Sequence, residues 1–87
     1  MIHTIEIRHH AFAPSSVTIS IGDQVQWSNF DATRHSARHD VDPVFDTGLI
    51  SSNTTTAPVT FTKVTPAAGI IYYCEPHPHM TGVIIVR

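Results

Sequence analysis

Short segments in which apolar and polar residues alternate constrain the fold of this chain more than any other feature. Residues Val17–Ile21 and Gln24–Ser28 each alternate in this way. A period of two residues is typical of a β-strand with one buried face, and no window shows a convincing helical period. Such segments recur at intervals of about ten residues, with turn residues such as Gly22–Asp23 between them. The pattern predicts an all-β sandwich or barrel.

Other parts of the chain complete this prediction. The remaining expected strands are Ile5–Arg8, Val59–Thr62, Ile70–Cys74 and Val83–Val86. Ala11–Ser16 is expected to interrupt the first strand, because Pro14 cannot donate a hydrogen bond to a central ladder. Residues 31–58 are the least regular part, with short strands expected only around 36–38 and 44–46. A stretch of that length with little regular structure is often functional in a small domain.

Composition limits the classes of protein to consider. The chain has 87 residues, 41% of them hydrophobic, and a formal charge of −2, which predicts one small domain over residues 1–87. Five Lys and Arg are too few for the basic stripe of a nucleic-acid-binding protein. No run approaches the roughly 18 apolar residues of a membrane span, and the first residues lack the pattern of a signal peptide. A single cysteine excludes an internal disulfide.

Several residues that could bind a metal lie between two of the expected strands near the C-terminus. Cys74, His77 and Met80 lie within seven residues there. A thiolate, an imidazole and a thioether are soft donors that suit copper, and two histidines, one cysteine and a weak axial methionine are typical of an electron-transfer copper site. The second histidine must come from elsewhere in the chain, and His35, in the irregular region, is the best candidate.

Several of these residues also have simpler interpretations. A lone cysteine such as Cys74 is often an inert buried side chain, and only its combination with the histidines and Met80 favours a metal. His79 lies between His77 and Met80, so it is an alternative ligand. The remaining histidines are expected at the surface without a specific role: His3, His9, His10 and His39. The aromatic residues Phe12, Trp27, Phe61 and Tyr72 are expected in the core.

The chain resembles the cupredoxins, which are small blue-copper proteins, and among them most the amicyanins, then the plastocyanins and pseudoazurins. The resemblance rests on residues 22–29, 35–36, 45–48 and 72–82, and on the short Cys-x-x-His-x-x-Met spacing. It implies a Greek-key β-sandwich of seven or eight strands with copper at one end. The implied ligands are His35, Cys74, His77 and Met80. Ser36 stands where the family most often has asparagine, and its hydroxyl has a shorter reach with which to bridge the two ligand loops.

The resemblance also implies a function. It is the transfer of single electrons through one type 1 copper, without catalytic residues, by a monomer that meets a c-type cytochrome or a redox enzyme transiently. The family works mostly outside the cytoplasm, which implies a periplasmic or otherwise extracytoplasmic location. Two alternatives stay open. One is a copper-delivery protein that uses Cys74, Met80 and the extra histidines; the other is a domain of a multicopper enzyme, for which His9 and His10 are a poor match to the paired histidines expected.

Overall fold

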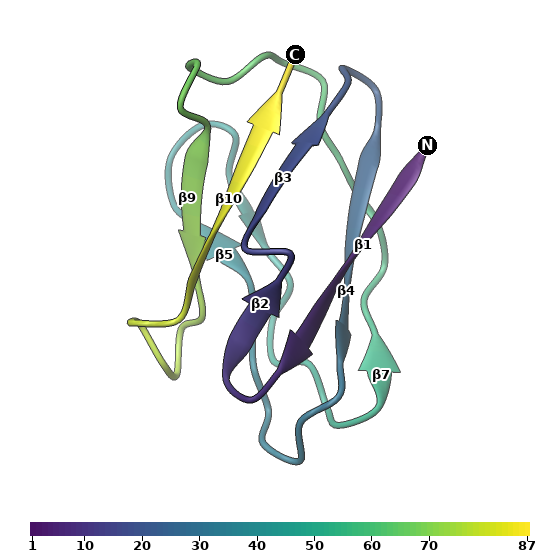
Figure 1. The fold of residues 1–87 in the computed structure, drawn as a ribbon, viewed down its shortest axis with the longest axis vertical. Coiled ribbons are helices and arrows are strands. Elements are labelled where there is room, and N and C mark those ends of the chain that lie inside the picture. Colours follow the sequence, from purple (N-terminus) through teal and green to yellow (C-terminus); the bar gives the residue numbers. More distant parts are fainter.

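The computed structural model describes residues 1–87 as ten β-strands without a helix (Figure 1). The strands are β1 (Ile2–Arg8), β2 (Ala11–Ala13), β3 (Ser16–Ile19), β4 (Gln24–Asn29), β5 (Arg38–His39), β6 (Phe45–Asp46), β7 (Thr54–Thr55), β8 (Val59–Thr60), β9 (Ile70–Tyr73) and β10 (Thr81–Val86). The all-β prediction is therefore confirmed. The chain contains no helix long and apolar enough to cross a membrane.

Two mixed sheets form the sandwich. One has the order β2-β1-β4-β7, with β8 also paired to β4, and the other has the order β3-β10-β9-β5-β6. Each sheet contains one parallel pair, β1 with β4 and β3 with β10, and its other pairs are antiparallel. There are more strands than the expected seven or eight. The edge beside β4 is divided into β7 and β8, and the two-residue segments β5 and β6 are each counted as a strand.

Aromatic side chains from both sheets fill the core. Trp27 of β4 is fully buried, stacks on Phe45 with ring centroids 5.4 Å apart, and donates its Nε1–H to the hydroxyl of Tyr72 at 3.3 Å. Gly82 makes room for this arrangement, since a Cβ there would lie 2.8 Å from Cε1 of Tyr72. Buried aromatic rings that meet across the two sheets contribute much of the apolar burial in so small a domain. The predicted core residues Phe12, Trp27, Phe61 and Tyr72 are all buried.

Three local predictions were wrong. The segment after β1 does not break the sheet, because residues Ala11–Ala13 return as β2 and pair with β1, and the turn falls at His9–His10 instead. Ile21 is 54% exposed, because β3 ends at Ile19. His39 is buried rather than at the surface, because its Nδ1 lies 2.8 Å from the carbonyl oxygen of Pro43 and its ring stacks on Phe45.

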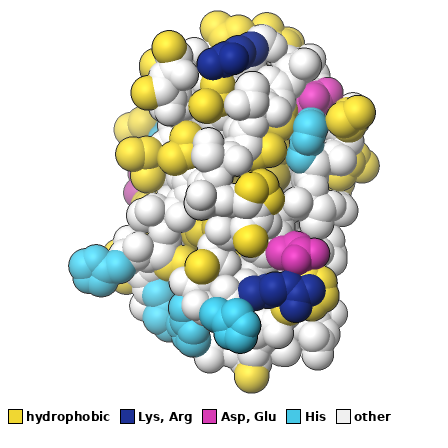
Figure 2. Space-filling model, viewed as in Figure 1, with side chains coloured by type: hydrophobic (Ala, Val, Ile, Leu, Met, Phe, Trp, Pro, Cys, Tyr) yellow, Lys and Arg dark blue, Asp and Glu magenta, His cyan; other side chains and the backbone are white.

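The loops that matter for chemistry gather at one end of the sandwich. Both chain termini lie at the other end (Figure 1). The β1–β2 turn and the β9–β10 loop, which carries Cys74, His77 and Met80, both lie at the lower end of the view. Side chains of histidine also gather at this lower end (Figure 2).

Candidate metal centre

The β9–β10 loop is closed by its own backbone. The amide of Cys74 donates to the carbonyl of Met80 at 3.0 Å, that of His77 to Cys74 at 3.2 Å, and that of Met80 to His77 at 2.9 Å. Cys74 is fully buried, Met80 is 6% exposed, and His77 is half-buried. These hydrogen bonds hold three of the predicted ligands on one tight loop.

His35 comes from the connection between β4 and β5 and is fixed there by a single β-bridge. It exchanges backbone hydrogen bonds with Ile50, and its side chain is fully buried. Asn29, at the end of β4, supports the bridge because its Nδ2 donates to the carbonyls of Ile50 at 2.9 Å and Thr33 at 3.0 Å. The ligand from the distant loop is therefore tied to the sheet by a buried amide.

Three donor atoms converge at this end of the sandwich. The Sγ of Cys74 lies 3.7 Å from Nδ1 of His35 and 3.7 Å from Nδ1 of His77, and the three ligand atoms lie within 4.8 Å of one another. A metal ion bonded at about 2.0–2.1 Å to nitrogen and about 2.3 Å to sulfur, at trigonal angles, would place the sulfur about 3.8 Å from each nitrogen. The set fits one metal ion.

The fourth predicted ligand differs from its neighbour in burial. Met80 belongs to the same buried cluster as Cys74, whereas His79 is exposed. A weak axial ligand must reach the metal from within the protein, so the burial of Met80 favours it over His79 as the axial ligand. This assignment stays a prediction, as does the role of His35, Cys74 and His77 as ligands.

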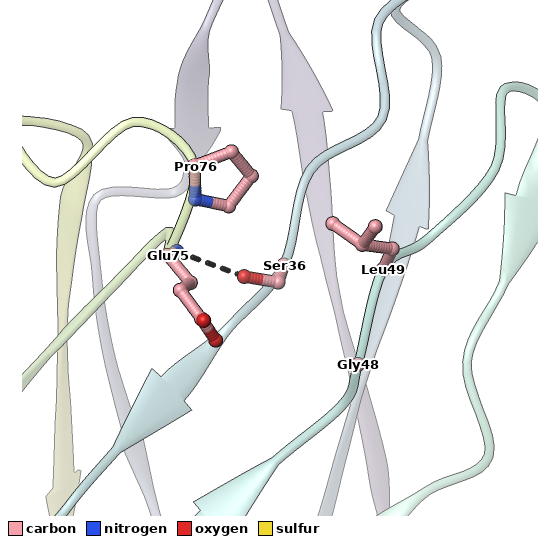
Figure 3. A pocket seen from close by; sticks show the side chains of 5 residues that line it. All are labelled: Ser36, Gly48, Leu49, Glu75 and Pro76. Atoms are coloured by element: carbon pink, nitrogen blue, oxygen red, sulfur yellow. Dashed lines mark hydrogen bonds between the residues drawn. The ribbon is translucent and has the colours of Figure 1, made fainter.

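Ser36 joins the two ligand loops despite its short side chain. Its backbone N–H donates to the Sγ of Cys74 at 3.3 Å, and its hydroxyl accepts a hydrogen bond from the amide of Glu75 at 2.9 Å. The two residues line a pocket of about 430 Å³ with Gly48, Leu49 and Pro76, in which the Ser36–Glu75 hydrogen bond is visible (Figure 3). The pocket lies beside the donor cluster, and none of the four predicted ligands lines it.

A carboxylate orients the ring of His35. Oδ2 of Asp31 lies 2.9 Å from Nε2 of His35, which makes this nitrogen the N–H donor and leaves Nδ1 free to face Cys74. Asp31 also accepts the backbone N–H groups of His9 at 2.7 Å and His10 at 2.8 Å. Burial acts to raise the pKa of Asp31, but the hydrogen bonds from His10, His9 and His35 outweigh it and lower the pKa below its usual value. Asp31 therefore remains a carboxylate.

One residue at this end has a place that the sequence did not predict. The ring of His10 lies edge-on to both proposed imidazole ligands, with centroids 5.0 Å from His35 and 5.3 Å from His77. One ring nitrogen of His10 also lies close enough to Asp31 and His35 for the three residues to form a group of potential metal donors. His10 is exposed, as predicted, but it contacts the metal centre.

Two imidazoles and a thiolate between the loops of a β-sandwich define a protein that carries a single soft metal ion, and copper suits these donors. The chain belongs to the plastocyanin/azurin family of copper binding proteins, whose family model matches residues 1–87. Its cofactor is therefore copper.

Solved structures support the fold. A reduced mutant of amicyanin superposes with a TM-score of 0.87 at 20% identity, over 98% of this chain and 81% of that protein. A copper(I) mutant of amicyanin with glutamine in place of a methionine superposes with a TM-score of 0.88 at 20% identity, over 99% and 82%. These matches confirm that the fold is that of a cupredoxin and is similar to that of amicyanin.

A larger protein also contains this fold. The copper-containing nitrite reductase (NirK) from Thermus scotoductus SA-01 matches 100% of this chain but only 22% of its own, at 27% identity and a TM-score of 0.86. The chain therefore corresponds in size to one part of that enzyme.

Proposed function

We propose that this protein carries single electrons through one type 1 copper ion held by His35, Cys74, His77 and Met80. The observation that supports this most is the position of the Cys74 sulfur, 3.7 Å from Nδ1 of both His35 and His77. Copper bound there would accept and release one electron by changing between Cu(II) and Cu(I). No substrate or catalytic residue is part of the proposal.

The residues around the donors serve electron transfer by holding them still. His35 is fixed through Asp31, and Cys74 accepts the backbone N–H of Ser36. Both side chains are fully buried, so water is kept from the thiolate. A site on rigid elements, with its donors fixed by outer hydrogen bonds, changes little between oxidation states, and a small change favours fast electron transfer.

His77 is the proposed point of electron exchange. It is the only half-buried member of the donor cluster, and exposed Pro76 and Pro78 flank it. A small apolar patch suits a brief encounter with a redox partner, for which interfaces are at the low end of the size range. The proposed partner is a c-type cytochrome or a redox enzyme, and the protein is proposed to act as a monomer in the periplasm or another extracytoplasmic space.

A redox titration followed by visible spectroscopy tests this function. The copper-loaded protein should show an intense blue absorption band when oxidised, lose it on adding one electron per copper, and regain it on reoxidation. A fully loaded oxidised protein without the band would instead favour a copper-delivery protein that holds Cu(I) without redox cycling.

The axial ligand gives a separate prediction. Met80→Gln should keep copper affinity within about tenfold of wild type, because the axial contact is a small part of the binding energy. It should lower the reduction potential, because an amide oxygen favours Cu(II) more than a thioether does. Voltammetry of Met80→Gln beside His79→Phe measures the difference. If His79 is the axial ligand instead, the His79 variant changes the potential and the Met80 variant does not.

The nitrite reductase match supports a second candidate, a domain that passes electrons to a catalytic copper in a larger enzyme. Such an enzyme requires a second metal centre, and the one other donor group of this chain, His10 with Asp31 and His35, shares His35 with the first. The mass of the polypeptide that carries this sequence in the cell distinguishes the two. A free chain of about 9.6 kDa favours the simple carrier, whereas its presence within a much longer polypeptide favours the enzyme domain.

A further inference from the structure

The buried donors have no direct access to solvent. Cys74 and His35 are fully buried, and Met80 is 6% exposed. A hydrated copper ion therefore cannot meet these donors first. Losing all of its water at once would cost much free energy, because no protein donor would yet replace the hydration shell. The ion must exchange its water molecules stepwise for side-chain donors on the way in.

His10 is placed to begin that exchange. Its ring is exposed, makes no hydrogen bond to another residue, and has centroids 5.0 Å from His35 and 5.3 Å from His77. One of its nitrogens lies within 4.8 Å of a carboxylate oxygen of Asp31 and a nitrogen of His35. The side chain of Asp31 is 15% exposed. An imidazole and a carboxylate thus lie together at the solvent edge, next to the buried ligands.

The backbone that presents His10 is held in an uncommon conformation. His9 and His10 have φ angles of 52° and 58°, in the left-handed region where glycine and asparagine are preferred for a two-residue hairpin turn. Asp31 stabilises the turn through both backbone N–H groups. The same carboxylate therefore fixes the turn and one ligand of the copper, which keeps the His10 ring beside the donor cluster.

We propose that His10 and Asp31 form an outer capture site that binds incoming copper and passes it to His35, Cys74 and His77. This rests on the proposed copper site. A nitrogen lone pair of His10 and an oxygen of Asp31 replace two water molecules of the hydrated ion. The ion then moves to the inner nitrogens, and the thiol of Cys74 releases its proton to solvent as its sulfur binds. The outer donors are left free, so His10 changes the rate of uptake and not the final site.

Stopped-flow mixing of the metal-free protein with copper(II) in a weakly coordinating buffer tests the proposal. Wild type, His10→Asn and His9→Asn are compared, with the growth of the blue band and the quenching of Trp27 fluorescence as two readouts. Asparagine tolerates positive φ, so both variants preserve the turn. His9→Asn is the matched control, because His9 shares the turn but has no ring contact with the ligands.

His10→Asn should slow copper uptake by about tenfold or more, because it removes one of the two donors that bind the ion in the rate-limiting step. His9→Asn should match wild type, and all three loaded proteins should develop a blue band. Equal rates for all three, faster uptake by His10→Asn, or equal slowing in both variants would overturn the proposal. In each of those cases a normal blue band leaves the proposed electron-transfer function standing; a wild type without the band contradicts that function itself.

Discussion

Replacing Cys74 with serine is expected to abolish the blue band of the oxidised protein. The band depends on a thiolate bonded to copper, and a serine hydroxyl does not ionise to replace it. Copper affinity should fall by more than the roughly 10–100-fold that loss of an outer-shell partner costs, because Cys74 lies at the centre of the donor set. Visible spectroscopy and competition with a copper chelator measure the two effects.

The metal-free variant supplies the control. Serine is close to cysteine in size, and at position 74 its hydroxyl can accept the Ser36 N–H that now points to sulfur. The fold should therefore survive, with thermal unfolding of the metal-free protein close to wild type. A blue band of normal intensity in Cys74→Ser would remove Cys74 from the ligand set.

Asn29→Asp is expected to destabilise the fold and weaken copper binding together. Asn29 is 1% exposed, and its Nδ2 donates to the carbonyls of Thr33 and Ile50. Aspartate places an oxygen against both carbonyl oxygens and buries a charge. The unfolding free energy should fall by about 3 kcal/mol or more, since each unsatisfied buried polar group costs about 1–3 kcal/mol. Ile50 forms the β-bridge to His35, so the ligand should also become mobile.

The chain's other asparagine is a matched control. Asn53 is exposed and has φ of 59°, a conformation that aspartate also tolerates. Denaturant unfolding of the metal-free Asn53→Asp protein should differ from wild type by less than about 0.5 kcal/mol. Equal loss of stability in the two variants would show that added negative charge, and not the buried amide of Asn29, is responsible.

The local pattern predicts the ligands on one loop but not their support. Cys74, His77 and Met80 are close in sequence, so a tight turn brings them together whatever the rest of the fold does. Asp31 and His10 are 21 residues apart along the chain, and their contact depends on how the β1–β2 turn meets the end of β4. His9 and His10 are not the asparagine or glycine residues that usually indicate a two-residue hairpin turn, and Pro14 is the stronger local signal for a break.

The strands show the same division. β1 and β4 alternate apolar and polar residues in sequence, and β10 contains a run of apolar residues, so the existence of these strands could be predicted. β7 consists of Thr54 and Thr55, which are both exposed, and it exists because it pairs with Ser28 and Asn29 of β4. His39 was predicted at the surface, but it is buried because the carbonyl oxygen of Pro43 lies within hydrogen-bond distance of its ring. Short edge strands and buried polar side chains are determined by distant partners, which a local pattern does not contain.

X-ray absorption at the copper edge of the loaded protein, in both oxidation states, tests the central claim most directly. The account predicts one short sulfur contact and two imidazole nitrogens, from Cys74, His35 and His77, with bond lengths that change little on reduction. A copper shell of nitrogen and oxygen alone, or a large change of ligands between Cu(II) and Cu(I), would contradict it.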